Sequence, residues 1–169
     1  IGEPLLAGQS VRNTYKDSLG LTIVTNPRGQ SGAAADAIIF DTNNPTGGDW
    51  DLLTGLPRSP ADQGNVLIIP EPGSQEPDAN ATGGWFRFKW EQPVVVKKVG
   101  LLDIDAGERG VILTRNDKSE DIRYEFEGIG NNTLQSVDLL DYGVSELSLF
   151  ISNGGAITNI LFAPSPEIF

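Results

Sequence analysis

The most constraining feature of the sequence is a series of short apolar segments in its second half, separated by turns rich in glycine and asparagine. The segments recur about every ten residues, a pitch typical of β-sandwiches and jelly rolls. They occupy residues 111–114, 122–126, 134–139, 147–151 and 156–162, with turns at 115–117, 128–132 and 152–155. The sequence therefore predicts an all-β fold, a single jelly-roll-like antiparallel β-sandwich.

The first half contributes further predicted strands, at 19–25, 33–40, 66–69 and 85–90. In 33–40 an alanine run favours a helix, but the apolar end Ile38-Ile39-Phe40 favours a buried strand, which we expect. Residues 85–90 alternate, so that Phe86, Phe88 and Trp90 share one face. Residues 94–105 contain two predicted extended stretches with a bend near Lys97-Lys98 or Gly100.

With 169 residues, the chain has the length of a single domain. We expect the sandwich to occupy residues 19–163, after an N-terminal arm or edge strand at 1–18. Residues 164–169 are proline-rich, which is unsuited to a central strand, and they form a predicted surface tail. The chain begins with isoleucine and contains no methionine, so we expect a processed, exported protein, secreted or at the cell surface.

Composition excludes several function classes. The chain has no Cys and no His, which excludes disulfides, a thiol nucleophile, a Ser-His-Asp triad and the usual zinc sites. The net charge of −11 opposes binding to nucleic acid or anionic lipid, and no apolar run is long enough to insert into a membrane. Catalysis by two carboxylates, as in glycosidases, remains open, but no catalytic motif is present and we expect no enzyme.

The most informative polar segment is 40–52, within the long loop predicted at 41–63. It gathers the oxygen donors Asp41, Asn43, Asp49 and Asp51, and Gly47-Gly48 permit sharp turns. Calcium takes six to eight oxygen ligands of these types, so we expect a calcium-organised loop. The segment is not an EF-hand, because position twelve is Leu52 where a bidentate Glu is required. The alternative is that these residues only form turns and cap their own backbone.

A second pair of carboxylates, Asp103 and Asp105, lies two residues apart and therefore on one face of an extended strand. We expect this pair either to complete the cation site or to remain solvated beside the next turn. Asp78 and Asn80 make a third, weaker oxygen cluster in the loop predicted at 70–84.

Aromatic residues offer a platform for sugars. Trp90 belongs to the predicted core face, whereas Trp50 and Trp85 are the candidate ligand-binding residues, with packing as the alternative role for each. Asn80 and Asn131 fit the glycosylation pattern Asn-x-Ser/Thr, which is relevant only to an exported eukaryotic protein.

Several segments together resemble exported β-sandwich modules of bacterial and microalgal cell-surface or matrix proteins, which are similar to galactose-binding-like jelly rolls. These segments are 40–52, 64–69, 78–84, 99–105 and 156–162. The resemblance implies a secreted jelly roll, often with a structural calcium, and no particular activity.

We therefore expect a non-catalytic, calcium-stabilised adhesion, carbohydrate-binding or matrix module whose partner is a glycan. The alternative is a structural subunit of a larger extracellular or membrane-associated assembly. In that case, the apolar ends at 1–6 and 168–169 would dock against neighbouring protein subunits.

Overall fold

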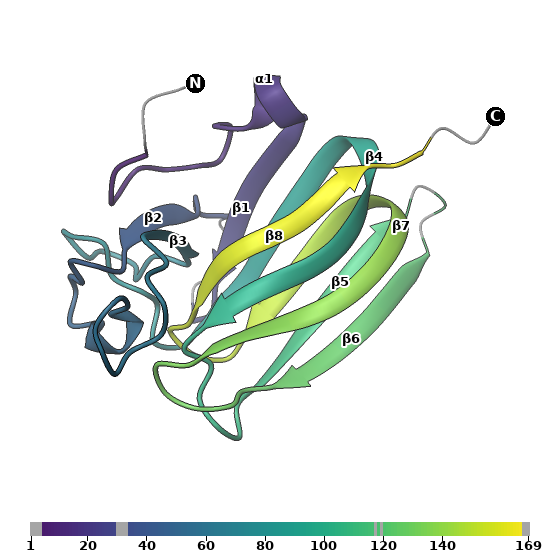
Figure 1. The fold of residues 1–169 in the computed structure, drawn as a ribbon. Coiled ribbons are helices and arrows are strands. Elements are labelled where there is room, and N and C mark those ends of the chain that lie inside the picture. The colour runs from purple at the N-terminus through teal and green to yellow at the C-terminus, as the bar shows by residue number, and fades with distance from the viewer. Residues whose placement is uncertain (1–4, 30–33, 117, 119, 167–169) are drawn as a thin grey trace.

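The computed structural model describes residues 5–29, 34–116, 118 and 120–166, and its described residues form an almost entirely β-structure (Figure 1). The only α-helix among them is α1 (Lys16–Leu19), and no helix in these ranges is long and apolar enough to cross a membrane. The strands are β1 (Leu21–Pro27), β2 (Ile38–Asp41), β3 (Asn65–Ile68), β4 (Gly84–Leu102), β5 (Arg109–Asn116), β6 (Asp121–Glu127), β7 (Leu134–Ile151) and β8 (Ala156–Pro164).

Two long strands, β4 and β7, run through both layers of the sandwich (Figure 1). The first half of β4 pairs with β1 on one side and with the second half of β7 on the other. The second half of β4 pairs with β8 and with the first half of β7. All the strand ladders are antiparallel, in the order β2-β3-β8-β4-β7-β5-β6, with β1 joined to β4.

The change of layer coincides with irregular pairing in β4. Its register against β7 shifts between Lys89 and Val94, again between Val94 and Val96, and again before Lys98. Pro93 lies within this stretch and cannot donate a hydrogen bond to the ladder. Bulges of this kind bend a strand and increase its twist, which allows one continuous strand to serve both layers.

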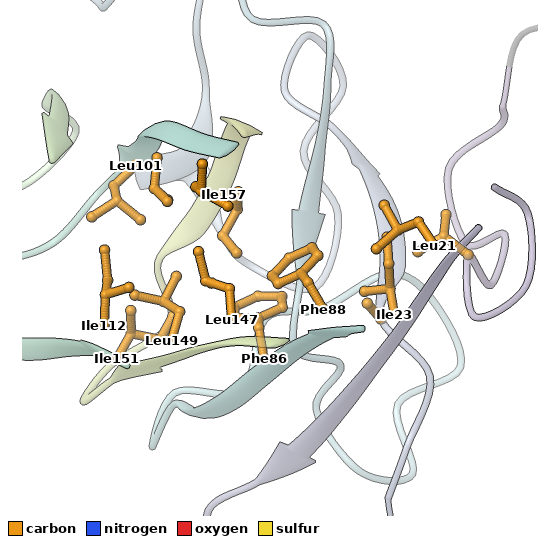
Figure 2. Close-up of a cluster of buried hydrophobic side chains, with 14 of the residues drawn as sticks. Leu21, Ile23, Phe86, Phe88, Leu101, Ile112, Leu147, Leu149, Ile151 and Ile157 are labelled. Atoms are coloured by element: carbon orange, nitrogen blue, oxygen red, sulfur yellow. The ribbon is translucent and has the colours of Figure 1, made fainter. Parts of the chain in front are cut away.

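The core lies between the layers and follows the period-two alternation of the strands. Phe86, Phe88 and Trp90 are buried in β4, whereas Arg87 and Lys89 between them are exposed. Phe86 and Phe88 lie beside their strand partners Leu149 and Leu147 in β7 and belong with them to a single apolar cluster (Figure 2). The predicted placement of Trp90 in the core is confirmed.

The predicted all-β class and antiparallel sandwich are confirmed, but several strand boundaries differ. Residues 134–139 and 147–151 belong to one strand, β7, and residues 85–90 and 94–102 belong to β4. The strand predicted at 33–40 is confirmed as a strand rather than a helix, but β2 begins only at Ile38. The bulged strands β4 and β7 contain polar residues or proline, which resemble the signals of a loop in a sequence. The predicted strand boundaries therefore fell inside these two strands.

The N-terminal arm is ordered from Leu5 onward by backbone hydrogen bonds. Gly8 donates to the Ile39 carbonyl at 2.8 Å and Val11 donates to the Ala37 carbonyl at 3.0 Å. The arm therefore lies against the edge of β2. At the other end, Pro164 closes β8. Of the apolar ends predicted to dock against neighbours, 1–6 and 168–169, residues 1–4 and 168–169 lie outside the described residues.

Candidate functional site

Loops from both halves of the chain meet at the end of the sandwich where β4 ends and β7 begins (Figure 1). We call this region the loop end; it comprises residues 42–64, 69–83, 103–108, 128–133 and 152–155. Side-chain hydrogen bonds join the loops to one another. Thr46 Oγ1 donates to the Pro77 carbonyl at 2.6 Å, and Asn153 Nδ2 donates to the Asp103 carbonyl at 3.3 Å. The loop predicted at 41–63 is thus an ordered structure, with a 3-10 helix at Trp50–Leu52.

Asp49 is half-buried between two of these loops, directly before the 3-10 helix. Its Oδ2 accepts a hydrogen bond from the Ala79 backbone N–H at 2.6 Å. Burial raises the pKa of Asp49 to about 6, although the Ala79 bond opposes the rise, and the charges of Asp78, Asp51 and Glu71 act in the same direction as burial. Asp49 is therefore a carboxylate held among other acids in a partly dry environment.

Asp103 directly follows the last residue of β4, and it is only 4% exposed. Its backbone has φ of 61°, a left-handed conformation that is uncommon for a residue with a side chain. Burial raises the pKa of Asp103 to about 6, with the charges of Asp51, Asp105 and Asp49 acting in the same direction. The predicted members Asp49, Asp51, Asp103 and Asp105 thus lie close enough for their charges to interact.

Asn132 connects the two halves of this acidic group. Its backbone N–H donates to Asp103 Oδ1 at 2.6 Å, while its side-chain Nδ2 donates to the carbonyl oxygens of Asp51 and, at 2.8 Å, Leu53. Asn132 also has a positive φ of 52°. The sequence indicated only a turn at this position, because nothing in a glycine- and asparagine-rich turn shows which distant loop it contacts.

Replacing Asn132 by alanine is expected to lower the free energy of unfolding by about 1–3 kcal/mol, because two loop carbonyls lose their donor and the left-handed backbone becomes strained. Asn132→Gly loses the same hydrogen bonds but tolerates the backbone conformation, so it should fall between the wild type and the alanine variant. Urea unfolding of the three proteins measures this order. Equal stabilities for all three would contradict the linking role of Asn132.

Asp41 and Asn43 are engaged in hydrogen bonds within their own turn, unlike the acidic group formed by Asp49, Asp51, Asp103 and Asp105. Asp41 Oδ1 accepts from the Asn43 backbone N–H at 2.9 Å, and its Oδ2 accepts from Asn44 Nδ2 at 2.7 Å. This arrangement is an Asx turn, the alternative role considered for these residues. In the part of the chain that the structure describes, no three acidic side chains already converge as a metal site. A metal would therefore have to draw the half-exposed Asp51 and Asp105 inward.

In the part of the chain that the structure describes, no lysine or arginine forms an ion pair with an acid of the loop end. The ion pairs formed by the described residues are Arg12–Asp36, Lys89–Glu146, Lys98–Asp138, Arg115–Asp121 and Arg123–Glu125, and none includes a loop-end acid. Buried carboxylates without a counter-charge destabilise a fold, and a bound cation removes that cost. The donor set, composed only of oxygen atoms, has the chemistry that Ca²⁺ prefers.

A polar groove of about 560 Å³ opens beside Asp49 at the loop end. Asp49, Glu71 and Asp78 bring carboxylate acceptors to it and Arg28 brings a donor, and its lining comprises residues 28–29, 47–49, 71–72 and 78–82. Gly47 is required in its wall, because a Cβ there would lie 2.6 Å from the Asp78 side chain and φ is 66°. The groove thus combines charged hydrogen-bonding groups with apolar lining that includes Pro72, Ala79 and Ala81.

The candidate aromatic residues differ in accessibility. Trp50 follows Asp49 directly in the chain and is 69% exposed, so its indole is accessible to a ligand, although Trp50 is not among the residues that line the groove. Trp85 is half-buried on the outer face of β4, where its ring packs 5.3 Å from that of Phe150. Trp50 is therefore the better-placed recognition residue, and Trp85 has a packing contact.

The two glycosylation candidates also differ. Asn80 is only 3% exposed, and its Oδ1 accepts from the Thr82 backbone N–H at 3.0 Å and from Thr82 Oγ1 at 2.8 Å. A buried, hydrogen-bonded amide is not accessible for glycan transfer, so the structure argues against Asn80 as an acceptor. Asn131 is exposed in its turn.

Away from the loop end, a buried carboxylate that the sequence did not indicate lies in a bulge of β7. Asp141 accepts hydrogen bonds from the hydroxyls of Thr114 and Tyr124. Burial raises the pKa of Tyr124 to about 12, reinforced by the hydrogen bond to Asp141 and its negative charge. These side chains come from three different strands, and no local spacing in the sequence links them.

No family model and no curated protein matches the chain. Among solved structures, it is similar to TmCBM61 in complex with β-1,4-galactotriose, at 9% identity and a TM-score of 0.47 over 94% of this chain and 100% of the other. A fucose-binding module of Streptococcus pneumoniae, SpX-3, has 14% identity and a TM-score of 0.39 over 60% and 73% of the two chains. The lectin domain of lectinolysin, complexed with Lewis b antigen, has 12% identity and a TM-score of 0.38 over 51% and 68%.

These three neighbours are a galactotriose complex, a fucose-binding module and a lectin domain, and each has a TM-score below 0.5. The function proposed below therefore stands on the residues of this chain.

Proposed function

We propose that this chain is an exported, non-catalytic binding module that recognises a neutral glycan at the loop end, with Ca²⁺ stabilising the loops beneath it. The observation that carries the proposal is the groove lined by Asp49, because the residue that follows Asp49 in the chain, Trp50, is highly exposed. Sugars combine hydroxyl groups with apolar ring faces, and a groove of hydrogen-bonding groups together with an exposed indole complements both. Adhesion to a cell surface or matrix would follow from such binding.

The charges of the groove determine which sugars it favours. Glu71 and Asp78, which are not among the proposed ligands of the ion, accept hydrogen bonds from hydroxyls but repel sulfate and carboxylate groups, and the whole chain carries a net charge of −11. Arg28 supplies a single cationic donor to this lining. Neutral oligosaccharides are therefore the proposed ligand class, in preference to sulfated or uronic acid-containing glycans.

Calcium has a supporting role in this proposal. Asp49, Asp51 and Asp103 would hold the ion, which would neutralise their charges and bring the 42–64 loop into a fixed position against the end of β4. The ion would thus hold the loop that presents Trp50 and one wall of the groove. The role of the ion is structural, and it takes part in no chemical reaction of the glycan.

A glycan array probed in the presence of Ca²⁺ tests the proposal. Arrays that include β-1,4-galactotriose and fucosylated Lewis structures, with sulfated and uronic acid-containing glycans beside them, should give signals only for neutral members. Replacing Trp50 by alanine should weaken binding about tenfold, because losing roughly 60 Å² of indole contact costs about 1.5 kcal/mol.

Tyr142→Ala is the matched control, because Tyr142 is also a highly exposed aromatic residue but lies on β7 away from the loop end. This variant should bind as the wild type does. A blank array, or equal losses from the two variants, would contradict glycan recognition at Trp50.

A further inference from the structure

The strand β6 forms a free edge of the sandwich. It pairs with β5 on one side, and no other strand of the described residues lies on its second side (Figure 1). At the two ends of this pair, the Asn116 backbone N–H donates to the Glu120 carbonyl at 3.1 Å, and the Gly128 N–H donates to the Glu108 carbonyl at 2.9 Å. Successive residues of an antiparallel strand direct their backbone groups to opposite sides. The even-numbered residues of β6 therefore face β5, and the odd-numbered residues face the free edge.

Backbone groups at a free edge can accept another strand. The residues of β6 that direct their N–H and C=O groups to this edge are Asp121, Arg123, Glu125 and Glu127. One of these groups is engaged, since the Glu127 carbonyl accepts a long hydrogen bond from Gln135 Nε2, at 3.4 Å. An open edge is a template for pairing with another chain, and natural proteins usually block it with charges, proline or a covering loop. In β6 the central positions, Arg123 and Glu125, remain open to a second strand.

The two faces of β6 have opposite characters. Its outer face is charged and exposed along the whole strand. On the inner face, Ile122 is 47% exposed, and Tyr124 and Phe126 are only half-buried although they pack against the core. A strand added beside β6 would cover apolar surface on the inner face and place its own side chains opposite the charges of the outer face. The charges therefore determine which strand fits.

The charge pattern of β6 is complementary to itself. When two copies of β6 pair antiparallel about Tyr124, all seven residues of the strand are paired, and Arg123 of each copy lies opposite Glu125 of the other. Opposite charges at directly opposed positions stabilise strand pairing, and like charges there oppose it. The smallest shift that keeps the free-edge groups opposed instead brings Arg123 opposite Arg123 in one direction, or Glu125 opposite Glu125 in the other. The register centred on Tyr124 is therefore favoured.

The remaining charges of this edge are balanced. In the same register Asp121 lies opposite Glu127 of the second copy, but each of these acids has an arginine beside it on β5. Arg115 Nε lies 2.8 Å from Asp121 Oδ1, and Arg109 is the ladder partner of Glu127. β5 and β6 together carry three arginines and three acids, so they are neutral although the whole chain has a net charge of −11. Two such edges can therefore approach without the repulsion that the net charge would otherwise cause.

We propose that the chain forms a two-fold symmetric dimer in which β6 pairs antiparallel with β6 of a second copy. A two-fold axis at Tyr124 makes every contact occur twice, as an isologous interface requires. The pairing would continue the layer β1-β4-β7-β5-β6 across both copies and place Ile122 opposite Phe126 of the second copy. Because the paired strands run in opposite directions, the two loop ends would lie at opposite ends of the dimer. If the loop end recognises glycans as proposed above, such a dimer would link two glycan-bearing surfaces.

Sedimentation equilibrium of the full chain, without Ca²⁺ or glycan, tests the proposal over about a hundredfold range of concentration. The measured mass should rise from 18.1 kDa towards twice that value as the concentration increases. Arg123→Glu and Glu125→Arg should each raise the dissociation constant of the dimer about tenfold, because each substitution opposes like charges at two symmetric positions. The double variant with both substitutions restores opposite charges and should dimerise as the wild type does.

Two further variants separate strand pairing from a general effect of charge. Glu125→Pro removes an N–H group that β5 does not use, so it should abolish dimerisation while the circular dichroism spectrum stays that of the folded protein. Glu91→Arg is the matched control for Glu125→Arg, because it makes the same change of charge at an exposed position of β4 beside β1, at the other edge of the layer. It should leave the dissociation constant unchanged.

A chain that stays monomeric at every concentration overturns the proposal. A dimer that both single charge variants leave unaffected, that the double variant fails to restore, or that persists in folded Glu125→Pro also overturns it. Should Glu125→Pro not fold, the three charge variants decide. Because these measurements contain neither ion nor sugar, they succeed or fail independently of glycan recognition at the loop end.

Discussion

Replacing Phe86 by alanine is expected to lower the free energy of unfolding by about 3–5 kcal/mol, a large part of the stability of an ordinary domain. Phe86 is fully buried and lies in β4, the strand that joins the two layers. Its ring stacks on that of Phe88, with centroids 6.3 Å apart. Removing it leaves a cavity that neighbours on both layers can fill only in part.

Phe150→Ala is the matched control for this prediction. Phe150 is half-buried on β7 and packs against Trp85 on the outer face of the same layer. The same chemical change should therefore cost only about 1–2 kcal/mol, since less apolar surface is lost from burial. Urea unfolding with a common m-value compares the two variants. Equal losses would contradict the division between an inner and an outer face of β4.

Calcium should raise the melting temperature of the EGTA-treated chain by about 5–11 °C when the ion is present at about a hundred times its Kd. At that concentration binding adds about 2.7 kcal/mol, and each kcal/mol raises the melting temperature of a domain of this size by about 2–4 °C. The physical reason is that the proposed ion would neutralise Asp49, Asp51 and Asp103, which form no ion pair with a lysine or arginine of the described residues. Magnesium should act more weakly, because it requires stricter geometry.

Asp103→Asn separates this mechanism from a general effect of salt. The amide still accepts the hydrogen bond from Asn132, but the charge is lost, so the metal-free variant should melt higher than the wild type and respond little to calcium. Asp41→Asn is the control, because Asp41 is engaged in an Asx turn and should keep the calcium response. Equal responses of both variants would exclude Asp103 as a ligand.

A strand could be predicted where the alternation of its residues in the sequence agrees with the side of the strand that is buried in the fold. In β4 the alternation of Phe86, Phe88 and Trp90 with charged residues matches the observed burial, and the turns at 128–132 and 152–155 lie between observed strands, whereas Arg115 and Asn116 of the turn predicted at 115–117 belong to β5. The continuity of β4 and β7 was not predictable, since Pro93 and Gly143 are loop signals in isolation. A bulged strand accommodates them only because its partners on both sides are fixed.

The loop end was predictable in its composition but not in its connections. Asp49, Asp51 and Asp103 could be identified from the density of oxygen donors, and the fold brings them into electrostatic contact. Asn132 acts across about 80 residues of sequence (81 to Asp51) and gives no local signal of that contact.

Amide NMR spectra of the isotope-labelled chain test most directly whether the loop end is the binding end of this module. The spectra are recorded while CaCl₂ and then a neutral oligosaccharide are added. Calcium should shift the signals of residues 49–51, 79, 103–105 and 132 with a stoichiometry of one, and the sugar should then shift residues 28–29, 47–50 and 78–82. Unchanged spectra, or shifts centred on the strands β5 and β6, would contradict the account.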